Sequence, residues 1–194
     1  MNSLRLVPIS IGTSAETAGA VGSKGCDGRT SPSTVGPQPM LRTIVRRSGE
    51  GDAYWFLGGL YEVLLSSDDT NGKTTIMQFT IPEGAGPPPH IHNCDEEVYV
   101  VDGTAKYNIG GELLDVAAGS IVHLPAGTTE TFVPQGTFKM LATYSPGGIE
   151  KFFAEAGEPA QRREIPPPPD GPPDVERLAA IGAKYGLELQ APPG

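Results

Sequence analysis

The stretch His90-Ile91-His92-Asn93-Cys94-Asp95-Glu96 decides how this chain is interpreted, because it holds two of the three histidines together with a carboxylate. Neutral imidazole is the commonest metal ligand in proteins. Side chains repeat every second residue on an extended segment, so His90 and His92 point the same way there. The stretch therefore predicts a metal-binding strand, and we expect the chemistry of the protein to lie around it.

Short β-strands are predicted on both sides of this stretch. Gly and Pro separate the expected strands, and Gly110-Gly111 marks the turn of a hairpin. This punctuation favours an all-β sandwich or barrel. The expected strands cover residues 61–65, 74–81, 97–101, 106–109, 112–116, 121–124, 130–133 and 138–144.

The two ends of the chain differ from this β-rich part in composition. Residues 1–40 are rich in Gly, Ser, Thr and Pro and are expected to form a disordered N-terminal arm, with Met40 as an alternative start of translation. Residues 41–146 are expected to form the barrel, and residues 147–194 a helical and Pro-rich tail.

A helix is predicted within that tail, after a stiff Pro-rich bridge at 165–173. Asp174 is suited to cap it, and Gly186 to end it. Its apolar stripe is expected to dock on the barrel or on a second subunit. The stripe comprises Val175, Leu178, Ile181 and Tyr185.

Charge and cysteine content exclude several classes of partner. The net charge is −9, from 14 basic and 23 acidic residues, which argues against nucleic-acid and membrane-surface binding. No apolar run approaches the roughly 20 residues of a membrane span. Cys26 and Cys94 are the only cysteines, too few for a disulfide framework, so reduced thiols in a cytoplasmic protein are expected.

Two spaced motifs carry a family resemblance. In the first, Gly84 is followed after five residues by His90-Ile91-His92, after three more by Glu96, and after six more by Gly103. The second runs from Gly119 through Pro125, Gly127 and Glu130 to Pro134. These spacings resemble the paired signature motifs of the cupin superfamily. The second motif departs from the family twice: Glu130 replaces the usual third metal-binding histidine, and Pro134 replaces a common Asn.

The resemblance covers about residues 42–192 and is nearest to single-domain cupins related to quercetin dioxygenases. It is also carried by residues 54–59, 87–92 and 175–180. It implies a cupin-type double-stranded β-helix (jelly-roll) barrel with a C-terminal helical tail, assembled as a homodimer. It implies His90, His92 and Glu96 as metal ligands. Counting back from Gly103 favours Glu96 over its neighbour Glu97 for that role.

Glu130 allows three interpretations. As a fourth ligand it would give two imidazoles and two carboxylates, a set suited to Fe²⁺ or Mn²⁺, with Ni²⁺ or Zn²⁺ also possible. Off the metal, it would act as a general base beside the site. Without any metal, two carboxyls in one small cavity would raise one pKa and still permit acid–base chemistry.

Other side chains near the motifs have both a functional and a structural interpretation. His123 would replace the missing histidine if it faced the cavity, or would lie on the outer face or in the core. Cys94 is expected to be a free thiol rather than a ligand. Several apolar residues would line a pocket or simply fill the barrel. These are Met77, Phe79, Tyr99, Tyr107, Phe132, Met140 and Tyr144.

The expected function is therefore a metal-dependent cupin oxidoreductase, a dioxygenase acting on a small aromatic or polyphenolic molecule. Two alternatives stay open, because this fold hosts unrelated reactions. One is a non-redox isomerase, cyclase or lyase that uses a metal or Glu130 for proton transfer. The other is a non-catalytic module that binds a small molecule in the barrel.

Overall fold

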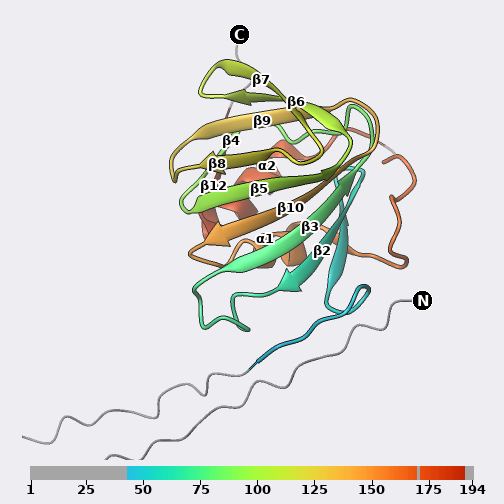
Figure 1. The fold of residues 1–194 in the computed structure, drawn as a ribbon, viewed down its shortest axis with the longest axis vertical. Coiled ribbons are helices and arrows are strands. Elements are labelled where there is room, and N and C mark those ends of the chain that lie inside the picture. The colour runs from blue at the N-terminus through green and yellow to red at the C-terminus, as the bar shows by residue number, and fades with distance from the viewer. Residues whose placement is uncertain (1–42, 170, 191–194) are drawn as a thin grey trace, which may run out of the picture. The chain divides into compact units, whose positions relative to one another are not determined.

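Two antiparallel sheets dominate the part of the chain that the computed structural model describes, residues 43–169 and 171–190 (Figure 1). The expectation for residues 1–40 lies outside these residues. The larger sheet has the strand order β11-β1-β2-β3-β10-β5-β8. Its strands are β1 (Ala53–Phe56), β2 (Gly59–Leu65), β3 (Thr75–Ile81), β5 (Asp95–Asp102), β8 (Ile121–Leu124), β10 (Phe138–Ser145) and β11 (Glu158–Pro159).

The smaller sheet has the order β12-β4-β9-β6-β7. Its strands are β4 (His90–His92), β6 (Thr104–Ile109), β7 (Glu112–Ala117), β9 (Thr129–Pro134) and β12 (Leu187–Leu189). Each of the eight expected strands is found, and the predicted hairpin joins β6 to β7 through Gly110-Gly111. The all-β barrel predicted from the sequence is thus confirmed.

Strict alternation of buried and partly exposed residues builds the core between the sheets. Along β3, Met77, Phe79 and Ile81 point inward, and β10 alternates in the same way. Aromatic rings extend this core to the helix α1 (Glu150–Ala156). Tyr61 stacks on Phe153 with ring centroids 4.8 Å apart, and Phe79 lies 4.7 Å from Tyr61. The helical side of the barrel is therefore closed by aromatic packing.

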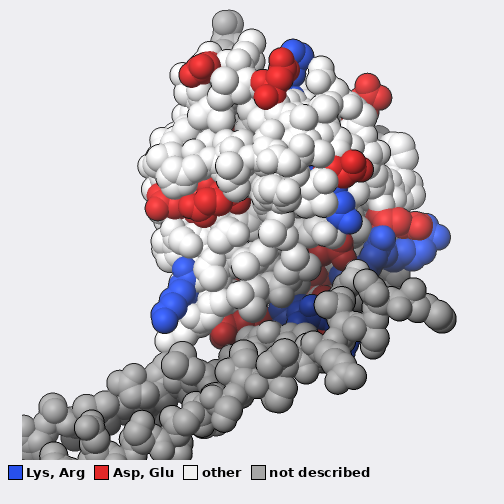
Figure 2. All heavy atoms as spheres, viewed as in Figure 1, with Lys and Arg blue, Asp and Glu red and all other residues white. Residues whose placement is uncertain are grey.

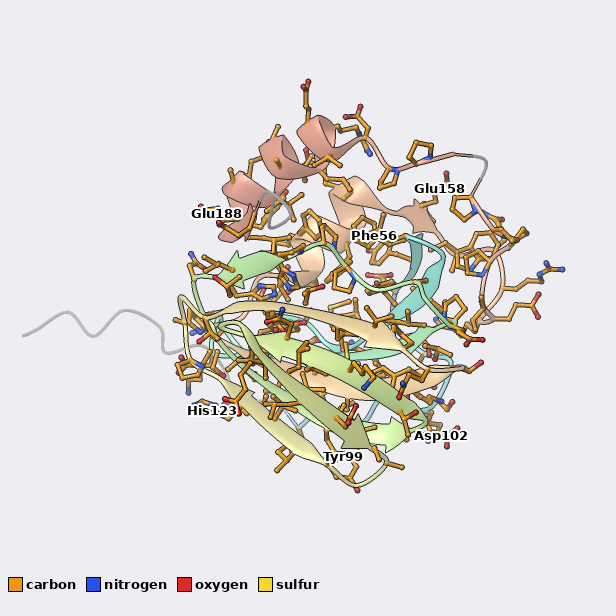
Figure 3. All side chains as sticks on the ribbon, turned by 90° about the horizontal axis from the view of Figure 1, so that it is seen from above. Phe56, Tyr99, Asp102, His123, Glu158 and Glu188 are labelled. Carbon is orange, nitrogen blue, oxygen red and sulfur yellow. The ribbon has the colours of Figure 1, made fainter. Side chains whose placement is uncertain are left out.

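Both helices lie on one side of the barrel (Figures 1 and 3). They are α1 (Glu150–Ala156) and α2 (Val175–Gly182), and a short 3-10 turn, η1 (Ala183–Tyr185), follows α2. Asp174 accepts a hydrogen bond from the backbone N–H of Arg177 at 2.9 Å, which confirms the predicted cap. Leu178 and Ile181 are buried as predicted, whereas Val175 is 53% exposed and does not belong to the docked stripe.

A buried carboxylate fastens α1 to the loop before β3. Glu150 accepts hydrogen bonds from the backbone N–H and the hydroxyl of Ser67, at 2.9 and 2.5 Å, and from the Thr75 hydroxyl at 2.5 Å. Burial raises the pKa of Glu150, but these hydrogen bonds outweigh it and leave the pKa below its usual value. The ionised form of Glu150 is therefore the one that stabilises the fold.

The tail also contributes two strands that the sequence did not predict. β11 pairs with β1, and β12 pairs with β4 in the register Leu187↔His92 and Leu189↔His90. The segment expected to be helical and Pro-rich thus supplies one edge to each sheet. Among the described residues, no helix has the length and the apolar character needed to cross a membrane.

Candidate metal centre

Strand β4 places both of its histidines inside the barrel. His90 and His92 are each 7% exposed, while Ile91 between them faces the other side. On one flank β4 pairs with β9, with His90 directly opposite Glu130. Residues opposite each other in a ladder project to the same face, so the Glu130 carboxyl lies beside the His90 ring.

The opposite sheet supplies the second carboxylate. Glu96 is 4% exposed and shares its inward face with Val98 and Val100. Glu97 points outward and contacts His123, with 3.1 Å between His123 Nδ1 and Glu97 Oε1. Strand parity thus directs Glu96 rather than Glu97 into the barrel. The interpretation of His123 as a substitute ligand is wrong, because its side chain is 57% exposed on the outer face.

The four predicted ligands are brought together unequally. Donor atoms of His90, His92 and Glu130 all lie within 4.8 Å of one another. Glu130 Oε1 is 3.6 Å from His90 Nε2 and 4.0 Å from His92 Nε2. Glu96 is not part of this set, but its Oε2 lies 3.4 Å from His92 Nε2. We call these four residues the cluster; three converge on one point and Glu96 borders them.

Backbone contacts fix how His90 presents its ring. His90 Nδ1 lies 2.9 Å from the carbonyl oxygen of Pro88. A carbonyl can only accept, so Nδ1 carries the proton and Nε2 keeps its lone pair toward the cluster. This is the arrangement that orients an imidazole for metal binding. The Pro87–Pro89 run before β4 holds that carbonyl in place.

Burial sets the protonation of the cluster. Burial raises the pKa of Glu130 well above its usual value, and the nearby Glu96 charge raises it further. Burial likewise raises the pKa of Glu96 to about 6. Burial lowers the pKa of His90. Burial and the proximity of His90 lower the pKa of His92 to about 3. Without a cation, burial thus favours the neutral form of both imidazoles and the protonated form of Glu130.

The donor set fits a divalent cation. Ligand atoms about 2.0–2.2 Å from one ion are roughly 3–4 Å from each other, which matches the separations within the cluster. Within the described residues, Glu96 Oε2 and His92 Nδ1 are buried without a hydrogen-bond partner. Two buried carboxyls are costly to ionise unless a positive charge lies beside them. His90, His92 and Glu130 could therefore hold a metal, with Glu96 within reach.

The cluster forms the polar end of a cavity of about 60 Å³. Of the residues considered from the sequence, Phe79, Phe132, Met140 and Tyr144 line this cavity, and Tyr99 is 47% exposed on the outer face. Further walls come from the tail, where the docking of Leu178 was expected from the sequence but its place in a cavity was not. They comprise Phe152 and Phe153 of α1, Leu178 of α2, and Leu187 and Leu189 of β12.

Two side chains next to the cluster have distinct roles. The Tyr144 ring lies 5.3 Å from that of His92, and the nearby Tyr144 side chain lowers the pKa of Glu96 against the larger effect of burial. Cys94 is buried, and burial followed by the charge of Glu96 raises the pKa of its thiol to about 11. Cys94 is therefore a neutral thiol at physiological pH, in keeping with the expectation of a free, non-coordinating cysteine.

The chain is similar to known proteins over its β-rich part. Residues 77–153 match the family model described as "Cupin domain". A quercetin 2,3-dioxygenase from Bacillus subtilis (strain 168) is 27% identical over 139 residues, which cover 71% of this chain and 41% of that protein. The chain thus spans less than half of that relative's length.

Similarity to a solved structure supports the fold alone. KdgF from Halomonas sp. superposes with a TM-score of 0.51 at 18% identity, covering 57% of this chain and 99% of that chain. An RmlC-like cupin from Shewanella frigidimarina NCIMB 400 gives a TM-score of 0.49 at 20% identity, covering 58% of this chain and 99% of that chain.

Proposed function

The chain is a member of the cupin superfamily that resembles quercetin-dioxygenase-like proteins, and on that premise we propose that it is a metal-dependent oxidoreductase. Its reaction is a dioxygenation of a small aromatic or polyphenolic molecule, in which both atoms of O₂ enter the product. The observation that supports this proposal best is the buried cluster of imidazoles and carboxyls at the polar end of an aromatic cavity.

In this proposal His90, His92 and Glu130 hold a divalent ion, and Glu96 stays off the ion and serves as the base beside it. A mixed imidazole and carboxylate set favours Fe²⁺ or Mn²⁺, with Ni²⁺ and Zn²⁺ as further candidates. When bound, Fe²⁺, Mn²⁺ or Ni²⁺ would supply the O₂ binding and one-electron chemistry that organic side chains lack, whereas the redox-inert Zn²⁺ would suit only a non-redox reaction.

The remaining work falls to the side chains of the cavity. Glu96 accepts the proton of a substrate hydroxyl at its unpartnered Oε2. The neighbouring Tyr144 side chain stabilises the ionised form of Glu96. Phe79 and Phe132 provide apolar walls for an aromatic ring, and the small volume of the cavity limits the water beside it.

A non-redox enzyme is the second candidate, and the raised pKa of Glu130 favours it. A carboxylic acid that keeps its proton at neutral pH can donate it to a substrate, and the neighbouring Glu96 can accept one. An isomerase, cyclase or lyase of this kind would lose activity in Glu130→Gln and would not need O₂.

Oxygen consumption tests the proposal. The chelator-treated protein is reconstituted separately with each candidate ion and mixed with flavonols, catechols and simple phenols in an oxygen-electrode cell. We expect O₂ uptake that depends on substrate and metal, with two ¹⁸O atoms from ¹⁸O₂ in the product. Turnover at the same rate without O₂ would reject dioxygenation in favour of the non-redox enzyme. Binding without any product would indicate a non-catalytic module.

We also propose that two copies associate through the outer face of β5 and β8. Tyr99 and Ile121 lie opposite each other in that ladder and are 47% and 67% exposed. Figure 3 shows Tyr99 on the side of the barrel away from the helices. On the face seen in Figure 2, acidic and basic residues do not form an extended patch of one charge. Light scattering during size-exclusion chromatography should give a dimer that Ile121→Lys weakens.

A further inference from the structure

A second hollow adjoins the cavity that holds the cluster. It is a cleft of about 520 Å³ between the β1–β2 turn and the Pro-rich segment, lined among others by Trp55, Pro166–Pro169 and Arg177. The Trp55 indole N–H donates to the Glu164 carbonyl at 3.0 Å, which holds the Pro-rich segment over the barrel. We call this hollow the outer cleft.

Three residues line both the outer cleft and the inner cavity. They are Phe56 at the end of β1, Leu57 in the β1–β2 turn and Leu178 on α2. Figure 3 shows Phe56 on the helical side of the barrel. The barrier between the two hollows thus consists of side chains from three separate elements. Side chains of this kind can move without breaking a backbone ladder.

Leu57 occupies a backbone conformation that its turn requires but that a leucine disfavours. The β1–β2 hairpin closes through two residues, Leu57 and Gly58, because Phe56 pairs directly with Gly59. Both turn residues have positive φ, 45° and 78°, as a type I′ turn requires. Asn or Gly is preferred at the first of these positions, and a bulky residue there is an outlier. The turn therefore does not explain the leucine, whereas its place between the two hollows does.

Another hollow adjoins the cavity but is sealed by backbone. A cleft of about 460 Å³ shares His92, Leu187 and Leu189 with the inner cavity. Strands β4 and β12 are paired there, and the backbone N–H of Asn93 donates to the Gly186 carbonyl at 2.9 Å. Hydrogen-bonded strands lie about 4.8 Å apart, too close for a molecule to pass between them. Of these two hollows, the outer cleft thus offers the easier route to the cluster.

We propose that ligands reach the cluster from the outer cleft, between Phe56, Leu57 and Leu178, and that Leu57 is the side chain that controls this entry. The route rests on the proposed function only in naming the cluster as its destination. The inner cavity is smaller than the roughly 300–1,000 Å³ typical of small-molecule sites, whereas the outer cleft falls within that range. The substrate is therefore an elongated molecule with one polar end at the cluster and a flat apolar body against Trp55 and the prolines.

Acylation of the histidines by diethyl pyrocarbonate tests the route without substrate or metal. The reagent attacks neutral imidazole, and peptide mass spectrometry gives a separate rate for each modified segment. His90 and His92 lie behind the barrier, while the exposed His123 serves as an internal reference. We expect Leu57→Gly to raise the rate at the β4 histidines about tenfold, the factor equivalent to 1.4 kcal/mol at 25 °C, and to leave His123 unchanged.

Two matched controls separate entry from loosening of the fold. Asn71→Gly changes the other described non-glycine residue with positive φ, and Asn71 lines neither hollow. Leu178→Ala and Ile181→Ala remove similarly buried side chains from one helix, but only Leu178 lines both hollows. We expect faster modification in Leu57→Gly and Leu178→Ala and wild-type rates in both controls.

The outcomes judge the route and the metal centre separately. Equal rates at the β4 histidines in Leu57→Gly and Asn71→Gly would overturn the route, and so would equal rates in Leu178→Ala and Ile181→Ala. Mn²⁺ added to the wild-type protein should slow modification of His90 and His92. Absence of that protection, with the effect of Leu57→Gly intact, would count against the metal centre and leave the route standing.

Discussion

In the metal-free protein, removing one carboxyl from the cluster should raise the stability relative to wild type, and this gain should grow as the pH rises. Glu96 is 4% exposed and has a pKa of about 6 in the folded protein, against a usual value of 4.5. A folded-state pKa above the unfolded value means that the folded state holds the proton more tightly. Stability is then lost as the pH rises from the unfolded pKa through the folded one. The variant Glu96→Gln has no such proton to lose.

The size of the effect follows from the shift. A shift of about 1.5 pH units corresponds to about 2 kcal/mol, reached when the pH is well above both pKa values. The wild-type protein has already lost roughly 1 kcal/mol of this stability at pH 5, because the carboxyl in the unfolded chain is mostly ionised at that pH. We therefore expect Glu96→Gln to gain about 1 kcal/mol relative to wild type between pH 5 and pH 8.

Urea denaturation of chelator-treated protein at pH 5, 6, 7 and 8 measures this difference directly. Comparing variant with wild type at each pH cancels the opposite contribution of His90 and His92, whose depressed pKa values cost stability in acid. Glu97→Gln is the matched control, because Glu97 is the next residue and points outward. A stability difference for Glu96→Gln that does not change with pH would refute the raised pKa of the buried Glu96 carboxyl.

Three further predictions concern other parts of the molecule. His92→Ala should abolish binding of Mn²⁺ measured by elemental analysis, whereas His123→Ala on the outer face should retain it. Gly86→Ala should destabilise the fold by about 3 kcal/mol in thermal melts, because a Cβ there would overlap a backbone carbonyl of β9. Gly171 has open space around it, so Gly171→Ala should not change the stability. Glu150→Gln should cost about 1–3 kcal/mol at pH 7, and the difference should disappear on acidification through the lowered pKa of Glu150.

Local periodicity explains why so much of the barrel could be predicted. Alternation along a strand fixes which side chains face inward, so Met77, Phe79 and Ile81 could be assigned to one face from sequence alone. The motif spacing from Gly103 favoured Glu96 over Glu97, and the burial pattern of β5 shows that Glu96 is the one that faces inward. For His123, both faces of β8 carry apolar residues, so parity gave no answer. Only the pairing of β8 with β5 places His123 beside Glu97 on the outside.

The tail shows where this reasoning ends. A strand of two or three residues, such as β11 or β12, is too short to display a period. Its existence depends on the free edge it meets, which is a property of the folded barrel rather than of the segment. The same holds for Leu57, since its turn would be predicted to contain Asn or Gly. Both features became visible only when segments distant in sequence were brought together.

The exchange of a histidine for Glu130 changes how the cluster would take up a metal. In the metal-free protein both imidazoles have lowered pKa values, so neither holds a proton at pH 7 that a cation must displace. The raised pKa of Glu130 favours the form of this carboxyl that holds one. Binding of a divalent ion should therefore release a proton from Glu130, and the apparent affinity should rise with pH. Titration calorimetry at pH 7 in two buffers of different ionisation enthalpy would measure that release. Heats that do not depend on the buffer would show that Glu130 was already ionised, and that the site differs less from an all-imidazole one than its sequence suggests.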